Sequence, residues 1–288
     1  MKKHDIRMAA AAGALASFSV ISMNQALAAD PWSFSANIGA VSNYIWRGVT
    51  QTGDQAAIQG GIDVSHESGF YAGTWASNVD WDEGGSEEVT GYVPVDPDTG
   101  LPMTDESGNY IVEGVTSGAD SDSPNYELDL YLGYGGAIND DFSYDISGIY
   151  YAYPDGRESD FGELGASATY KWFTLGLAYT VYGENDGGLF DDGDMYYYGG
   201  AEFALPYEFG FSVRGGYYDF RHDDVEVGVD ADGFAVNESA DYWHYGASIS
   251  REAGDFGTFS FNWDQNNGKQ EVGYDTDPKF WVGWNKEF

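Results

Sequence analysis

Few side chains in this sequence could carry acid–base or nucleophilic chemistry. The chain has no cysteine and four histidines: His4, His66, His222 and His244. Only His244 lies in an alternating segment that would direct its ring into a protected interior, where a histidine can act as a general base. A hydrolase would need it beside a nucleophile such as Ser248 or Ser212, and no motif joins them. We therefore predict no catalytic residue and keep a lipid hydrolase-like enzyme as an alternative.

Acidic side chains dominate the charged residues. Asp and Glu number 48 against 12 Lys and Arg, a formal net charge of −36. We predict no nucleic-acid partner, because phosphate contacts need clustered bases. Asp96-Pro-Asp98 and Asp191-Asp192-Gly-Asp194 resemble fragments of calcium loops, but neither has the full ligand spacing. We predict no metal site and no cofactor, while weak divalent-cation binding by the acidic loops stays open.

The amino-terminal 28 residues match the pattern of a secretory signal peptide. Lys2, Lys3 and Arg7 precede a short apolar stretch, and Ala26-Leu27-Ala28 supplies the small residues that a signal peptidase reads. The apolar stretch is too short for a membrane-spanning helix. We predict cleavage after Ala28 and one mature domain over residues 29–288.

The mature chain alternates apolar and polar residues with a period of two, which indicates β-strands. In residues 126–134, for example, Leu128 and Leu130 share one face and Glu127 and Asp129 the other. The predicted strands lie near 33–46, 55–65, 70–81, 124–136, 142–152, 160–170, 173–182, 195–204, 208–220, 241–251, 256–264 and 279–288.

The connections between these segments alternate between long and short. The short ones include 171–172 and 205–207, and the longest is the acidic segment 82–123. A transmembrane barrel sorts its loops in this way, with short periplasmic turns and long outer loops, whereas a soluble sandwich has no reason to do so. We predict an all-β fold, a transmembrane antiparallel up-and-down β-barrel of about 12 strands with long acidic extracellular loops.

Aromatic residues gather at the predicted strand ends, as in the interfacial girdles of an outer-membrane barrel. We place Tyr44, Trp46 and Tyr196 in the outer girdle and Phe142 and Trp172 in the inner one. The last strand ends on an aromatic residue, which is typical of the signal read by the barrel-assembly machinery. The residues predicted to form this assembly signal are Phe280, Val282, Trp284 and Phe288.

The stretch Val41-Ser-Asn-Tyr-Ile-Trp-Arg-Gly-Val-Thr-Gln51 resembles the opening of the TorF-type porin family, a Gcw_chp-like outer-membrane β-barrel. The family pattern Ser-x-Tyr-x-x-Arg-Gly-x-x-Gln is matched by Ser42, Tyr44, Arg47, Gly48 and Gln51. The run Gly69-Phe-Tyr-Ala-Gly-Thr-Trp-Ala-Ser-Asn78 is similar to a second family signature. The resemblance implies a porin-type barrel and transfers no catalytic residue.

The alternation also predicts which charged side chains face the lumen. The candidate pore-lining residues are Asp63, Glu127, Asp129, Asp145, Glu163, Glu202, Arg214 and Asp264. Glu287, Lys171 and Lys279 share this phase, and Arg47 and Asp80 lie at the predicted mouth. Arg47 either lines the mouth or, as we favour, pairs with loop carboxylates. An alternative for Arg214 is a pair across the lumen with Asp129 or Asp145.

These predictions converge on a passive outer-membrane channel for small solutes. The acidic lumen and mouth favour cations over anions. The expected surroundings are outer-membrane lipids and lipopolysaccharide in the bacterial outer membrane. Besides the enzyme, a plugged barrel with a structural or adhesive role is an alternative.

Overall fold

The computed structural model describes residues 31–81, 89–92, 113–116, 123–185, 188–229 and 234–288. The predicted signal peptide and most of the predicted loop 82–123 lie outside these residues. The chain divides into two compact units, one of residues 1–81 with 124–288 and one of residues 82–123. No helix in the described part of the chain is long and apolar enough to cross a membrane. The helices described there are the short 3₁₀ turns η1 (Pro206–Glu208), η2 (Gly254–Phe256) and η3 (Gln270–Val272).

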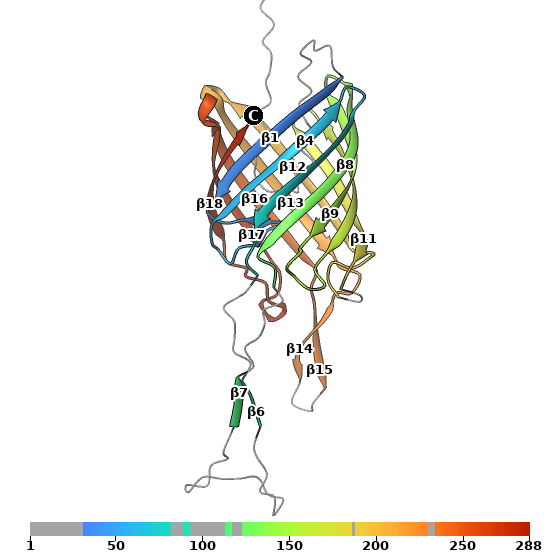
Figure 1. Ribbon diagram of the computed structural model, residues 1–288, viewed down its shortest axis with the longest axis vertical. Helices are drawn as coiled ribbons and strands as arrows, with labels where there is room; N and C mark the ends of the chain where they lie inside the picture. Colours follow the sequence, from blue (N-terminus) through green and yellow to red (C-terminus); the bar gives the residue numbers. More distant parts are fainter. Residues whose placement is uncertain (1–30, 82–88, 93–112, 117–122, 186–187, 230–233) are drawn as a thin grey trace, which may run out of the picture. The chain divides into compact units, whose positions relative to one another are not determined.

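The larger unit is a closed antiparallel barrel of twelve strands (Figure 1), which confirms the predicted fold. Strand β1 pairs with β18 to close it, as Ala40 opposite Trp284 illustrates. The barrel strands are β1 (Trp32–Val41), β4 (Ala57–His66), β5 (Phe70–Asn78), β8 (Tyr126–Asn139), β9 (Phe142–Ala152), β10 (Phe161–Tyr170), β11 (Phe173–Gly183), β12 (Met195–Leu205), β13 (Phe209–Asp219), β16 (Tyr242–Glu252), β17 (Thr258–Asn266) and β18 (Lys279–Glu287).

Short and long connections lie at opposite ends of this barrel. We call the end with the short turns, such as Lys171-Trp172 between β10 and β11, the turn end. The other end, the loop end, bears a hairpin of β14 (Asp224–Val229) and β15 (Ala235–Ser239) and a small hairpin of β2 (Ile45–Trp46) and β3 (Val49–Thr50). In the second unit, β6 (Val89–Tyr92) pairs with β7 (Glu113–Thr116).

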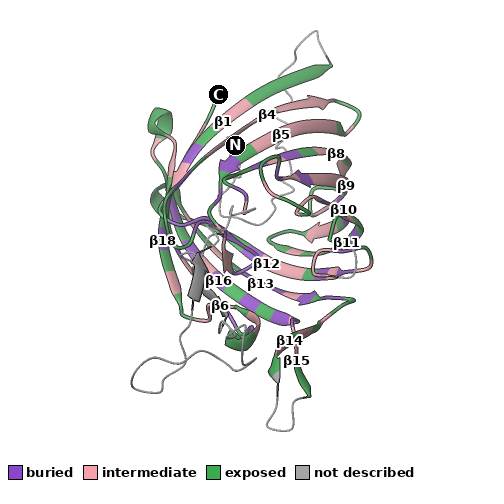
Figure 2. Ribbon diagram, turned by 60° about the horizontal axis from the view of Figure 1, so that its bottom comes forward, coloured by how far each residue is buried: buried purple, intermediate pink, exposed green. Residues whose placement is uncertain are grey.

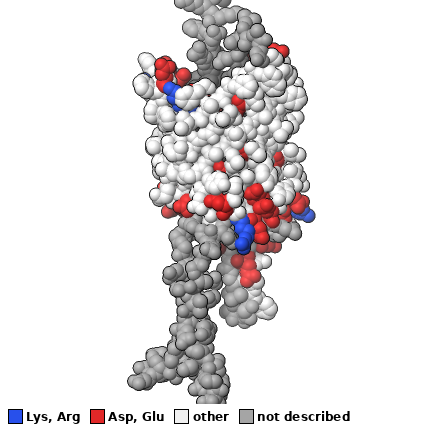
Figure 3. Space-filling view, in the orientation of Figure 1, with Lys and Arg blue, Asp and Glu red and all other residues white. Residues whose placement is uncertain are grey.

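The outward face of the barrel strands is a belt of exposed apolar side chains. The middle of the outer wall has few charged residues in Figure 3, and acidic groups gather toward the loop end. Large apolar residues remain far more exposed than a core would allow: Ile58 63%, Ile62 61%, Leu132 66%, Ile146 59% and Leu164 56%. The alternation of each strand therefore directs its apolar side chains away from the interior, and its polar ones toward it.

The lumen differs between its two halves. In the turn-end half, inward positions such as Ser35 and Glu202 are exposed, and Figure 2 shows β1 exposed over its amino-terminal part. In the loop-end half, inward side chains are buried, with Glu127 2% and Tyr218 0% exposed. The interior is thus open to solvent toward the turn end and filled toward the loop end.

Candidate lumen constriction

The small β2–β3 hairpin fills the loop-end half of the lumen. Its two central residues, Arg47 and Gly48, have φ of 47° and 81°, the left-handed pair that a two-residue type I′ turn requires. Ile45, Trp46 and Arg47 are only 2%, 7% and 3% exposed. A hairpin that extended from the barrel rim could not be buried in this way. The predicted first strand, 33–46, therefore ends at Val41, and the residues beyond it turn inward.

Arg47 anchors the tip of this hairpin to the barrel wall. Its guanidinium makes a two-pronged ion pair with Glu163 of β10, with Nη1–Oε1 at 2.8 Å and Nη2–Oε2 at 2.6 Å. The cation also lies 4.0 Å from the centre of the Tyr196 ring and 4.2 Å from that of Trp46. The planar guanidinium suits both contacts, because it can bind a carboxylate edge-on while aromatic rings cover its faces. The pairing that we predicted is present, but its partner is a strand carboxylate and not a loop one.

Gly48 allows the hairpin to approach β16 closely. A Cβ atom at this position would overlap the side chain of His244. Its carbonyl oxygen accepts a hydrogen bond from Nδ2 of Asn266, on β17, at 2.9 Å. The absence of a side chain and the left-handed backbone both favour glycine here.

His244 faces inward, as its strand phase predicts. Its Nε2 is hydrogen-bonded to the hydroxyl of Tyr196 at 2.7 Å, and its Nδ1 is buried without a partner. A catalytic histidine is normally oriented by a group bonded to that second nitrogen. This environment resembles a packing contact more than a catalytic triad.

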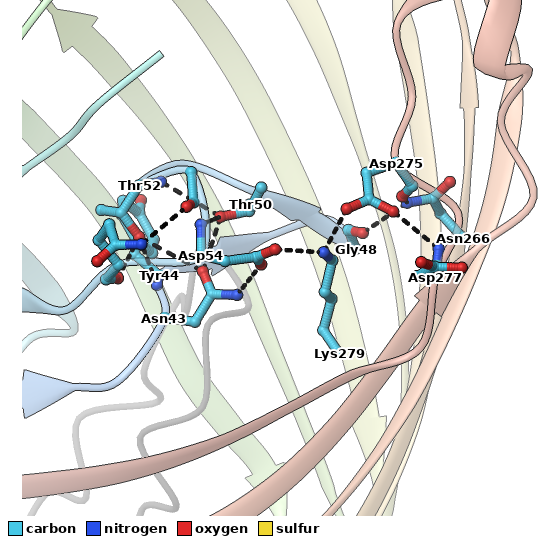
Figure 4. A network of polar contacts seen from close by, with 12 residues as sticks. Asn43, Tyr44, Gly48, Thr50, Thr52, Asp54, Asn266, Asp275, Asp277 and Lys279 are labelled. Atoms are coloured by element: carbon cyan, nitrogen blue, oxygen red, sulfur yellow. Dashed lines mark hydrogen bonds and ion pairs between the residues drawn. The ribbon is translucent and has the colours of Figure 1, made fainter. Parts of the chain in front are cut away.

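Polar contacts hold the remainder of the segment 42–56 on two further sides (Figure 4). The hydroxyl of Tyr44 donates to Glu127 of β8 at 3.1 Å. Asp54 accepts from Nζ of Lys279, on β18, at 2.6 Å, and the same ammonium contacts Asp275. Within the segment, Thr52 hydrogen-bonds the backbone of Tyr44 and Gln55. The segment 42–56 is therefore tied to β8, β10, β17 and β18.

An aromatic cluster fills the rest of the loop-end half of the lumen. Buried residues from the hairpin and from several strands are in mutual contact: Tyr44, Trp46, Tyr151, Tyr153, Phe161, Tyr196, Tyr218 and Tyr242. The assignment of Tyr44, Trp46 and Tyr196 to the outer girdle was therefore wrong. Their side chains point into the lumen, where the hairpin provides apolar surface that the sequence pattern of a single strand does not reveal.

The candidate pore-lining residues all occupy inward strand positions. Glu127, Asp129, Asp145, Glu163 and Asp264 are buried, while Asp63 is half-buried and Glu202 is exposed. Sequence analysis missed Glu252, which continues the inward phase of β16 at the turn end. On the inward face of the twelve described barrel strands, acids thus far outnumber the two bases, Arg214 and Lys279.

Two predicted basic positions differ from expectation. Lys171 is in the turn between β10 and β11, where it lies 3.7 Å from Asp141 and does not line the lumen. Arg214 pairs with Asp264, two strands away, with Nη2–Oδ2 at 2.5 Å and Nε–Oδ1 at 3.1 Å, and not with Asp129 or Asp145.

Trp281 also binds the Asp264 carboxylate that pairs with Arg214, through a hydrogen bond from Nε1 at 2.8 Å.

Asp80, which we placed at the mouth, is exposed, and its backbone N–H donates to the carbonyl of Gln51 at 2.8 Å.

The carboxyl-terminal residues of the predicted assembly signal lie at the seam of the barrel. Phe280, Val282 and Phe288 are 65%, 53% and 70% exposed, whereas the indole of Trp284 donates to the carbonyl of Phe256 at 2.7 Å. The backbone N–H of Phe288 donates to Ala36 of β1 at 2.9 Å. The last residue therefore takes part in closing the barrel.

Solved structures with a similar fold are outer-membrane porins. The KdgM porin is 7% identical, with a TM-score of 0.47 and coverage of 88% of this chain and 99% of that one. The NanC porin is 10% identical, with a TM-score of 0.46 and coverage of 88% and 98%. OprD from Pseudomonas aeruginosa is 11% identical, with a TM-score of 0.40 and coverage of 90% and 67%.

No curated protein matches the sequence. The TorF-type assignment stays a prediction. A family match covers most of the chain, residues 25–277, and its description is "Bacterial protein of unknown function (Gcw_chp)". The chain belongs to the Gcw_chp family.

Proposed function

We propose that this chain is an outer-membrane channel that passes small solutes and favours cations. The apolar belt supports the membrane location, because a soluble protein rarely exposes so large a contiguous apolar surface. The closed barrel leaves no unpaired strand edge in the lipid. The start of β1 and the end of β18 then lie at the periplasmic turn end, and lipids, lipopolysaccharide and the barrel-assembly machinery are the expected partners.

The observation that carries the proposed cation preference is the excess of inward acids. Asp63, Glu202 and Glu252 face the solvent-accessible half of the lumen. The inward base Arg214 is buried and is neutralised by Asp264. Uncompensated carboxylates in a narrow, low-dielectric lumen raise the local concentration of cations and repel anions.

The hairpin limits what this channel can pass. With Arg47 bound to Glu163 and the aromatic cluster closed, the loop-end half has little room for a bulky solute. We therefore propose that small solutes follow a narrow path beside the hairpin. This path would widen when the hairpin moves away from the barrel wall.

The experiment is conductance of the purified barrel in planar bilayers under a salt gradient, with wild type and Arg47→Met side by side. We expect a cation-selective reversal potential, largest at low salt where screening is weakest. Arg47→Met should raise conductance, because it removes the ion pair that holds the hairpin tip. Asp63→Asn with Glu202→Gln should reduce the selectivity, whereas Asp140→Asn, at an exposed turn, should not.

An anion-selective potential would contradict the cation preference. Absence of current from both wild type and Arg47→Met would contradict the channel itself and favour the plugged structural barrel. The unpartnered Nδ1 of His244 argues against the hydrolase alternative, and lipid hydrolysis by the purified barrel would restore it.

A further inference from the structure

The outward face of the barrel strands carries almost no charge, and its two bases lie on neighbouring parts of the wall. Among the outward positions of the twelve barrel strands, three residues are Asp, Glu, Lys or Arg: Asp219, Arg251 and Lys286. Asp219 ends β13 at the loop end, whereas Arg251 and Lys286 are the second-last residues of β16 and β18, at the turn end. Only β17 separates these two strands. Because a lipid-facing charge is tolerated only near the membrane interface, the two bases mark that level on the wall.

No acid of the described residues neutralises either base. Arg251 is exposed, and its side chain makes no hydrogen bond or ion pair in the part of the chain that the structure describes. Lys286 donates from Nζ to the backbone carbonyl of Asp255 at 2.5 Å, which is a neutral acceptor. The acids next to the two bases in sequence, Glu252 and Glu287, have the opposite strand phase and face the lumen. Two positive charges are thus left at the outer wall of a strongly acidic protein.

Aromatic rings hold both basic side chains against the wall. The guanidinium of Arg251 lies 5.3 Å from the centre of the Phe209 ring, and the ammonium of Lys286 lies 5.2 Å from that of the Phe288 ring. Such contacts orient a cation and leave its N–H donors free for another partner.

A groove in the outer wall begins beside these bases. Its volume is about 460 Å³ and its lining includes Ala40, Phe259, Val282 and Trp284. Phe259 is the partner of Arg251 across β16 and β17, and Trp284 precedes Lys286 by two residues on the same face. Ala40 is the partner of Trp284 across β1 and β18, where its short side chain leaves the groove open. The bases therefore lie on the turn-end side of an apolar groove that crosses the seam of the barrel.

We propose that Arg251, Lys286 and this groove bind one anionic phospholipid, with its phosphate between the two bases and an acyl chain in the groove. A guanidinium binds phosphate through two parallel N–H donors, and a lysine adds a second positive charge. From the strand spacing and the rise per residue, the Cα atoms of the two bases are on the order of 12 Å apart. Two long side chains and a phosphate can span that separation.

The site rests on the proposed outer-membrane location and deepens it by naming a lipid partner. In that location the turn end faces the periplasm, so the bases lie at the leaflet that consists of phospholipids, and lipopolysaccharide lies at the other. A net negative headgroup is favoured over a zwitterionic one, because two uncompensated bases face it. The bound acyl chain would cover the junction of β1 and β18.

The site can be tested by native mass spectrometry of the folded barrel from neutral detergent micelles, without any measurement of current. Phosphatidylglycerol and phosphatidylethanolamine with identical acyl chains are titrated in separate runs. We expect one phosphatidylglycerol per barrel, bound about fivefold or more tightly than phosphatidylethanolamine. Arg251→Gln with Lys286→Gln should weaken phosphatidylglycerol binding about twentyfold, which corresponds to about fivefold for each base.

Matched controls separate the site from general effects of charge and surface. Lys171→Gln removes a base at the same end of the barrel, in the turn between β10 and β11, and should leave binding unchanged. Ala40→Phe fills the groove without a change of charge and should weaken binding roughly tenfold, by loss of apolar contact with the acyl chain. Ala166→Phe makes the same change at an exposed outward position of β10 and should have no effect. A heat-dependent shift on a gel confirms that each variant is a closed barrel.

Several results would overturn the site. Equal phosphatidylglycerol affinity in wild type and the Arg251→Gln, Lys286→Gln variant would remove the role of the bases, and an unchanged affinity in Ala40→Phe would remove that of the groove. Displacement of the lipid by an equal concentration of glycerol 3-phosphate would show a site for free phosphate. Tighter binding of lipopolysaccharide than of phosphatidylglycerol would contradict the phospholipid.

The outcome is independent of the proposed channel activity. Phosphatidylglycerol binding by a barrel that conducts no current would leave the lipid site standing and refute the channel. Cation-selective current from a barrel that binds no phosphatidylglycerol would do the reverse.

Discussion

At the scale of single residues, Asp194 is a buried acid in a loop, and its burial raises the pKa of its carboxyl group. It lies before β12, is 0% exposed, and its Oδ1 accepts the backbone N–H of Arg221 at 2.8 Å. Its other carboxylate oxygen is buried without a partner. Desolvation by burial raises the pKa of this carboxyl group to about 6, although backbone hydrogen bonds oppose the shift.

This shift predicts a pH dependence of local stability. An unfolded aspartate has a pKa of about 3.9, so the folded loop binds more protons than the unfolded chain between about pH 4 and 6. The stabilising contribution is complete below about pH 4 and is lost as the pH rises through about 6. Asp194→Asn should abolish this component.

The measurement is hydrogen exchange of the Arg221 amide against pH, corrected for its intrinsic rate. Asp192→Asn is the matched control, because Asp192 is an exposed neighbour that contacts the Arg221 side chain. It should retain the wild-type slope. Identical slopes in wild type and Asp194→Asn would show that another group is responsible.

At the scale of elements, the β2–β3 hairpin depends on how closely its tip approaches β16. Gly48 and Gly53 both have positive φ, 81° and 52°, in the same connection. A Cβ at Gly48 would overlap His244, whereas at Gly53 its nearest neighbour would be the carbonyl of Asp80 at 3.8 Å. The two glycines thus share a left-handed backbone, which would be strained in any residue with a Cβ, and they differ in steric contact.

Gly53→Ala should reduce the free energy of unfolding by about 1–2 kcal/mol, the usual penalty of a left-handed alanine. Gly48→Ala should cost more than this, because the hairpin must also move away from His244. It should also raise conductance toward that of Arg47→Met. Urea unfolding in lipid vesicles and single-channel recording measure the two effects. Equal losses in both variants would mean that the contact with His244 is unimportant.

At the scale of the whole molecule, the barrel depends on the seam between its first and last strands. Phe288 exchanges backbone hydrogen bonds with Ala36, at 2.9 and 3.3 Å, and its ring is exposed beside the ammonium of Lys286. In the proposed outer-membrane location, a charge at this position would face the membrane interface, and we expect it to disturb recognition of the last strand.

Phe288→Asp should therefore reduce assembly of the barrel strongly. Phe234→Asp is the control, because Phe234 is equally exposed, at 70%, beside the β14–β15 hairpin. The fraction of outer-membrane protein that shifts on a gel after heating measures the closed barrel, which has no edge at which to begin unfolding. Equal fractions in both variants would contradict an assembly role for the terminal aromatic.

The period-two pattern determined most of the architecture without tertiary information. In β8, alternation alone placed Leu130 outward and Glu127 and Asp129 inward, because successive side chains of a strand must point to opposite faces. The even number of segments and the sorting of loop lengths then specified an up-and-down barrel. The strand positions are local properties, so a single sequence is enough to read them.

The constriction was decided only by the tertiary structure. Residues 42–46 include Tyr44, Ile45 and Trp46, which are residue types that favour strands. The local sequence therefore cannot distinguish a strand that continues from a hairpin that turns into the lumen. The choice depends on Glu163, 116 residues from Arg47, and on aromatic rings of other strands. Arg214 likewise finds Asp264, 50 residues away. Such partners follow from barrel closure and strand stagger, which bring distant inward positions together and which no local pattern encodes.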